Sequence, residues 1–114
     1  MNLEKYLTHS NSSIRAFAKM ALSTDEPEKY KIIEGEINYI PDEYTFAMVV
    51  DLYNQHLTEI PRKVIYCEIL DCSNNRLTYL PELPYCEILY CNYNNLKKLP
   101  QLPKCEELHC ENNQ

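Results

Sequence analysis

The chain has 114 residues, of which 45% are apolar and 25% charged. These proportions are typical of one folded globular domain and unlike those of disordered, collagen-like or coiled-coil chains. The net charge of −6 opposes long-range attraction to nucleic acid and to anionic membrane surfaces, so we expect neither as a partner. The longest apolar run, Phe46–Val50, is too short to span a bilayer, and the N-terminal residues lack the apolar core of a signal peptide. We therefore expect a cytoplasmic protein.

The first predicted element is helical and spans Asn2–Leu22. Apolar residues recur there at the spacing of one helix face, with Leu3 and Leu7 on a first segment and Ile14, Phe17, Ala18 and Ala21 on a second. Ser12 or Ser13 is the expected N-cap of the second segment. Such a helix pair, in a domain of residues 1–26, is expected to cover the open apolar end of the repeats that follow.

Residues 27–114 contain an internal repeat. Four columns of identical residues recur at a step of 19: Cys67, Cys86 and Cys105; Leu70, Leu89 and Leu108; Cys72, Cys91 and Cys110; and Asn75, Asn94 and Asn113. A step of 20 extends the pattern upstream and places Val50 and Leu52, and then Tyr30 and Ile32, under Leu70 and Cys72. We therefore predict about five repeat units, beginning near Pro27, Ala47, Cys67, Cys86 and Cys105, with the last unit incomplete at Gln114.

Each repeat unit predicts one short parallel strand followed by an extended return. Because successive side chains of a strand point to opposite faces, Leu70 and Cys72 are expected to face the core and Asp71 to face outward. The return has about nine residues, fewer than a typical helix needs. Pro81 and Pro84 favour a polyproline-like conformation, which requires no glycine, and the chain has only one glycine.

The unit C-x-x-L-x-C-x-x-N-x-L, from Cys67 to Leu77, resembles the core of the leucine-rich repeat with cysteine at two leucine positions. Its L-P-x-L-P ending is similar to the short repeats of bacterial type III secretion effectors and of giant amoebal virus proteins. The resemblance implies an α/β leucine-rich repeat solenoid with short parallel strands, an extended polyproline-like convex side and an N-terminal helical cap. For a viral protein or a secreted effector, the expected cytoplasm is that of the host.

Two repeated columns are interpreted as structural. A buried amide offers both a donor and an acceptor, so Asn75, Asn94 and Asn113 are expected to satisfy backbone groups where the chain leaves each strand. All six cysteines occupy core-facing columns, where a free thiol acts as a small apolar side chain. Disulfides between neighbouring units and a zinc site are the alternatives, but each column holds an odd number of thiols and the spacing is not a common zinc spacing.

No constellation in the sequence predicts catalysis. His109 adjoins Cys110, but adjacent strand residues point to opposite faces and cannot form a nucleophile and base pair. Glu68, Glu87 and Glu106 recur once per unit, and we interpret them as a solvated acidic edge rather than a cation site. His9 and His56 are interpreted as isolated exposed residues. We therefore expect no enzyme activity, no cofactor and no metal ion.

The outward face of the predicted strand ladder remains as the candidate site. It is expected to carry aligned aliphatic side chains among tyrosines and acidic groups, a mixture typical of protein-binding surfaces. The predicted partner-binding residues are Val49, Asp51, Tyr53, Ile69, Asp71, Ile88, Tyr90 and His109.

The sequence thus predicts a non-enzymatic module that binds an unknown protein partner. Two alternatives remain: the recognition part of a larger effector enzyme such as a ubiquitin ligase, as the effector resemblance implies, and a structural component of a virion or other assembly. A further expectation concerns residues 105–114. The uncovered last unit predicts either a continuation of the repeats or self-association through this C-terminal edge.

Overall fold

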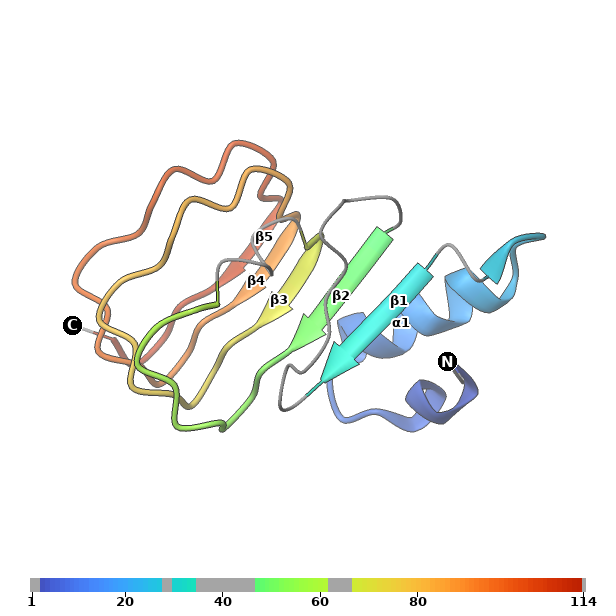
Figure 1. Ribbon diagram of the computed structural model, residues 1–114, viewed down its shortest axis with the longest axis horizontal. Helices are drawn as coiled ribbons and strands as arrows, with labels where there is room; N and C mark the ends of the chain where they lie inside the picture. Colours follow the sequence, from blue (N-terminus) through green and yellow to red (C-terminus); the bar gives the residue numbers. More distant parts are fainter. Residues whose placement is uncertain (1–2, 28–29, 35–46, 62–66, 114) are drawn as a thin grey trace.

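The computed structural model describes residues 3–27, 30–34, 47–61 and 67–113. This part of the chain is mixed α/β. Its helices are η1, a 3₁₀ helix over Leu3–Thr8, and α1 over Ser12–Leu22. Its strands are β1 over Tyr30–Glu34, β2 over Ala47–Asp51, β3 over Ile69–Asp71, β4 over Ile88–Tyr90 and β5 over Glu107–His109. The strands form one parallel sheet in chain order, β1 to β5, as Figure 1 shows.

The sheet has a different core on each face. Val50, Leu70 and Leu89 are aligned on neighbouring strands and pack against the residues of the connecting segments, including Leu77 and Leu83. The opposite face, which we call the ladder face, carries two aligned rows of residues from successive strands. These rows are Ile32, Val49, Ile69, Ile88 and Glu107, and then Asp51, Asp71, Tyr90 and His109. The predicted short parallel strands and their alternating faces are confirmed.

The chain leaves each of the strands β2 to β5 through a residue with left-handed backbone geometry. Asn54, Asn74, Tyr93 and Asn112 hold equivalent positions after β2, β3, β4 and β5, and their φ angles lie between 56° and 60°. Among residues other than glycine, asparagine adopts this backbone region more readily than most. Tyrosine does not share this preference. The polyproline-like return segments therefore do not by themselves explain why the chain has so little glycine. At three of these bends, asparagine stands where glycine is common.

The predicted role of the asparagine column is confirmed. Asn75 donates from Nδ2 to the carbonyl oxygens of Leu52 and Cys72, at 2.9 and 2.8 Å, and accepts at Oδ1 from the backbone N–H of Leu57 at 3.0 Å. Asn94 and Asn113 repeat the arrangement in the two units that follow. Each asparagine thus joins its own unit to the preceding one.

The N-terminal helices pack on the ladder face, a placement that the sequence did not predict. Most of the first unit, whose end they were expected to cover, lies outside the described residues. Ile14, Phe17 and Ala18 of α1 form one apolar cluster with Ile32, Val49 and Ile69, so the helix lies on the ladder face of β1, β2 and β3. The reason is complementarity between the apolar stripe of α1 and the aligned aliphatic row of the ladder face. The N-cap is Asn11, not Ser12 or Ser13.

Two local expectations in the N-terminal part also need correction. Because η1 is a 3₁₀ helix, Leu3 shares its buried side with Tyr6 at i+3, while Leu7 is exposed. The register of β1 differs from the step of 20, since Ile32 pairs with Val49 and Ile33 with Val50. Ile32 therefore belongs to the ladder face, where it contacts the α1 cluster, rather than to the predicted inner column.

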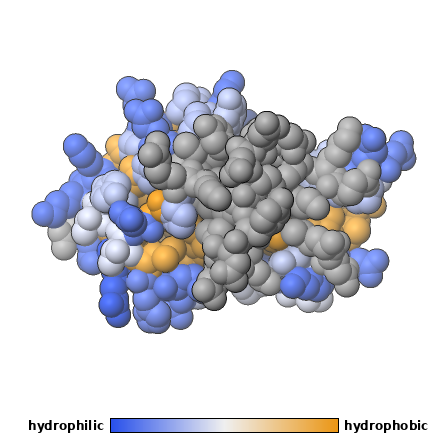
Figure 2. All heavy atoms as spheres, in the orientation of Figure 1, coloured by the Kyte–Doolittle hydropathy of each residue, from blue (hydrophilic) through white to orange (hydrophobic). Residues whose placement is uncertain are grey.

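The molecule is elongated, with principal extents of 43 × 28 × 28 Å. The space-filling view shows hydrophilic residues around its C-terminal end with apolar residues between them (Figure 2). Leu99 and Leu108 are exposed there. The predicted self-association through residues 105–114 stays a prediction.

Candidate functional site: a groove beside the ladder face

The predicted binding residues fall into two groups. Val49, Asp51, Ile69 and Asp71 are each less than a tenth exposed. The prediction of an open surface is wrong for these four, because the N-terminal segment and α1 cover β2 and β3. Ile88, Tyr90 and His109 are half-buried, and the side chain of Tyr53 is exposed.

A groove of about 380 Å³ lies where the N-terminal segment crosses the ends of the strands. It is lined by residues of that segment and of the bends after β2, β3 and β4: His9, Ser10, Asn11, Asp51, Tyr53, Asp71, Ser73, Asn74, Tyr90, Asn92 and Tyr93. Four of the predicted residues are among them, namely Asp51, Tyr53, Asp71 and Tyr90. The groove therefore joins part of the predicted face to a segment far from it in the sequence.

Three hydrogen bonds hold the N-terminal segment against successive strands. His9 Nε2 lies 2.8 Å from Asp51 Oδ2, and Asn11 Nδ2 donates to Asp71 Oδ2 at 3.1 Å. Ser13 Oγ lies 2.6 Å from the Tyr90 hydroxyl. Asn11 also caps α1, since its Oδ1 accepts from the backbone N–H of Ser13 at 2.8 Å. One residue thus fixes both the start of the helix and the wall of the groove.

The hydrogen bonds of His9 define its tautomer. Nδ1 accepts from the backbone N–H of Asn11 at 2.9 Å, so it carries no proton. Nε2 is then the protonated nitrogen of a neutral ring and donates to Asp51. The interpretation of His9 as an isolated exposed residue is wrong.

Asp51 and Asp71 carry the charge of the groove. Each accepts at Oδ1 from a backbone N–H two residues on, Tyr53 or Ser73, at 3.1 Å. Burial raises the pKa of the Asp71 carboxyl, as does the nearby Asp51, while the hydrogen bonds from Ser73 and Asn11 oppose the rise. A carboxylate has about four lone-pair positions, so these contacts leave acceptor capacity on both side chains.

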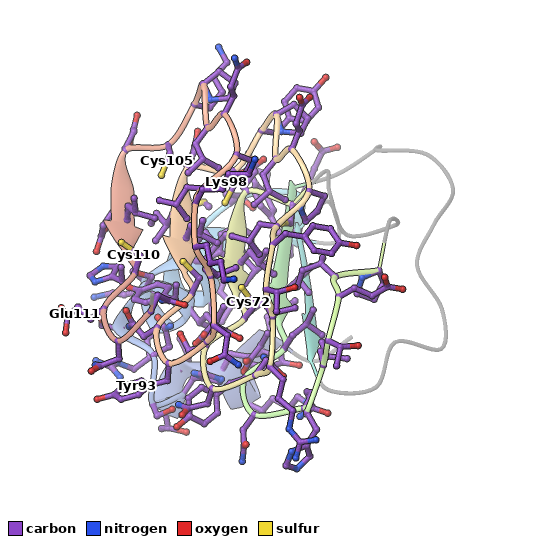
Figure 3. All side chains as sticks on the ribbon, turned by 90° about the vertical axis from the view of Figure 1, so that its left-hand side faces the viewer. Cys72, Tyr93, Lys98, Cys105, Cys110 and Glu111 are labelled. Carbon is purple, nitrogen blue, oxygen red and sulfur yellow. The ribbon has the colours of Figure 1, made fainter. Side chains whose placement is uncertain are left out.

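An aromatic stack continues the ladder beyond the groove. The Tyr90 and His109 rings are parallel, with centroids 4.3 Å apart, and His109 Nε2 lies 2.7 Å from Glu107 Oε1. His109 is therefore engaged with Tyr90 and Glu107 on the ladder face. Figure 3 shows Tyr93 and Glu111 along the same edge of this end of the molecule, and the Tyr93 N–H donates to the Glu111 carbonyl at 3.0 Å.

Sequence reasoning missed much of the groove. Ser73 and Asn92 lie in the outward position next to the predicted residues, and the repeat itself identifies them. Asn74 and Tyr93 mark the left-handed bends, for which a recurring asparagine is the available signal. His9 and Asn11 carry no signal, because their partners are 42 and 60 residues away in the sequence.

The six cysteines are free thiols in the structure, and their burial follows their position along the repeats. Cys67, Cys72, Cys86 and Cys91 are buried, Cys105 is half-buried, and Cys110 is exposed on the last unit. Burial, followed by the nearby Cys110, raises the pKa of Cys91 to about 12. Burial likewise raises the pKa of Cys72 and of Cys105. The raised pKa values favour the protonated form of these three thiols, which is less reactive than the thiolate.

The repeated glutamates form an edge away from the groove. Burial raises the pKa of Glu87, and the neighbouring carboxylates of Glu68 and Glu106 add to the rise. Glu87 and Glu106 are exposed.

Comparisons with protein-family models, curated proteins and solved structures give no match to this chain. Within the described part of the chain, neither helix has the length and apolar character needed to cross a membrane.

Proposed function

We propose that the protein is a non-enzymatic interaction module of the leucine-rich repeat solenoid type, and that a protein partner binds in the groove beside the ladder face. The consecutive parallel strands, the recurring left-handed bends and the asparagine column support the repeat architecture. The groove itself carries the functional proposal, because successive units present polar and aromatic side chains to one concave surface.

The groove suits a protein segment in both size and chemistry. Tyr53 and Tyr93 are about half exposed, at 50% and 56%, and provide large apolar rings with a polar tip. Asn74 and Asn92 add amide groups that both donate and accept hydrogen bonds. The free thiols suit a reducing compartment, so we place this activity in the cytoplasm.

Site-specific photo-crosslinking tests this proposal. A benzophenone amino acid replaces Tyr53 or Tyr93 in the groove, or Tyr79 as the matched exposed tyrosine outside it. In cytoplasmic extract, the two groove positions should give adducts with one common protein, and position 79 should not. Equal adducts at all three positions, or none at the groove positions, would show that the groove is not the binding surface.

A further inference from the structure

The strongest chemical feature of the groove is the negative charge of its lining. The carboxylates of Asp51 and Asp71 both line it, and none of the described lining residues is lysine or arginine. The nearby Arg15 donates its guanidinium hydrogen bonds to the backbone carbonyls of His9 and Ser10 instead. The neutral tautomer of His9 means that its hydrogen bond to Asp51 supplies no positive charge. Two like charges therefore lie together in a partly buried setting, which is unfavourable without a counter-charge.

The arrangement of these groups favours a guanidinium rather than a simple point charge. Each carboxylate keeps unused lone-pair positions beside its two existing hydrogen bonds. The rings of Tyr53 and Tyr93 also line the groove, and the face of an aromatic ring is a surface on which a planar cation stacks. A guanidinium provides five N–H donors in one plane, together with a flat surface for such stacking.

We propose that the groove binds an arginine side chain of an extended basic segment of the partner, an inference that rests on the proposed function of the groove. The carboxylates of Asp51 and Asp71 accept hydrogen bonds from the guanidinium, and Tyr53 and Tyr93 enclose its flat faces. The amides of Asn74 and Asn92 bind the peptide backbone next to it. The net charge of the chain, −6, attracts such a segment over longer distances.

A direct titration separates charge from shape. The probes are a blocked hexapeptide of alternating arginine and glycine and the same peptide with citrulline, a neutral side chain of nearly the same shape. Nuclear magnetic resonance follows the backbone amides of Ser73 and Asn74. The arginine peptide should bind at least about tenfold more tightly, and the difference should shrink as salt is raised. Equal binding of the citrulline peptide overturns the proposal.

The repeat supplies variants that should leave the fold intact. Tyr93→Asn places asparagine at a left-handed bend where Asn74 and Asn112 already stand, and Tyr53→Ser copies the equivalent Ser73. Each should weaken the arginine peptide about threefold or more through loss of a ring face. Tyr79→Asn, outside the groove, should leave binding unchanged. Unchanged binding in both groove variants contradicts the proposal.

A charge exchange tests the carboxylate directly. Asp71→Asn should weaken the arginine peptide, and adding Asn11→Asp should restore the binding, because it returns one charge to the same hydrogen-bonded pair. Aspartate also serves as an N-cap, so α1 keeps its first contacts. Displacement of the arginine peptide by neutral maltohexaose would instead assign the groove to glycans and overturn the proposal.

Competition with the crosslinked partner distinguishes this inference from the proposed function. If the arginine peptide reduces the adduct at position 93 and the citrulline peptide does not, the result supports both the proposed function and the arginine inference. An adduct that resists the arginine peptide leaves the groove as the partner site but rejects an arginine side chain as its occupant. Absence of any adduct rejects the proposed function, whereas the peptide titration still decides the chemistry of the groove.

Discussion

The contribution of Asp71 to the free energy of unfolding depends on pH. Burial is the main reason its pKa is raised, and Asp51 adds to the effect. A raised carboxyl pKa means that the folded state binds the proton more tightly than the unfolded state. The free energy of unfolding contributed by this group therefore falls as pH rises through the interval above about 4.

This sign gives a prediction for Asp71→Asn, whose side chain does not titrate. The stability of the wild type relative to the variant should decrease as pH rises from about 4 to about 7. Urea unfolding of both proteins across this range measures the difference. A relative stability that increases with pH would mean that the hydrogen bonds from Ser73 and Asn11 outweigh burial.

The buried amide of Asn94 is expected to contribute strongly to the stability of the fold. Replacing it with alanine removes the acceptor for the Leu77 N–H and the donor to the carbonyls of Cys72 and Cys91. Since Asn94 is buried, Asn94→Ala should destabilise the fold by about 2 to 5 kcal/mol. Its exposed neighbour Asn95 is the control, and Asn95→Ala should change the unfolding midpoint little. Equal effects would argue against the asparagine column as a stabilising feature.

For individual residues, the sequence predicts those that face the core well and those that line the groove poorly. The asparagine and leucine columns are visible because a fixed spacing repeats the same environment. The hydrogen bond between His9 and Asp51 spans 42 residues and occurs once, so no periodicity reveals it. Tyr93 was likewise unmarked, because nothing in its residue type indicates a positive φ.

The position of α1 has a direct energetic consequence. Ile14 is fully buried in the cluster that α1 forms with the ladder face. Ile14→Ala should therefore lower the free energy of unfolding by about 2 to 5 kcal/mol. Met20 is exposed on the same helix, and Met20→Ala should have little effect.

Chemical denaturation of both variants, with the fluorescence of Tyr6 and the other tyrosines as the signal, measures these effects. A small loss for Ile14→Ala would mean that the helix is only loosely packed on the sheet. In that case the four covered residues of the ladder face would again be open to a partner.

The elements themselves were more predictable than their placement. An apolar stripe predicts a helix over most of 2–22, but it does not state which apolar surface the helix covers. In the structure α1 covers the row that contains Val49 and Ile69. The register of β1 was mispredicted for a related reason, since Tyr30 and Ile32 fit either face of a strand equally well.

For the whole molecule, thiol exposure predicts an order of labelling. Cys110 and Cys105 lie on the last unit, as Figure 3 shows, while the other four thiols are buried. In the native state a maleimide reagent should label Cys110 first and Cys105 more slowly. Cys67, Cys72, Cys86 and Cys91 should react only under unfolding conditions.

Mass spectrometry of the labelled protein over time gives the order. As a control, the variant Cys110→Ser should lack the fastest phase of labelling, while the labelling rates of the other five cysteines should not change. Labelling of Cys67 or Cys72 at the native rate of Cys110 would contradict the burial of the inner column.

The asparagine column also sets an order of events during synthesis. Asn75 satisfies backbone groups of the unit before it, and Asn94 and Asn113 do the same for Leu77 and Leu96. A unit emerging from the ribosome therefore lacks these acceptors until the next asparagine follows, about one unit later. Each unit is completed by its successor, so the last unit to have emerged keeps unsatisfied backbone groups until the next asparagine follows it.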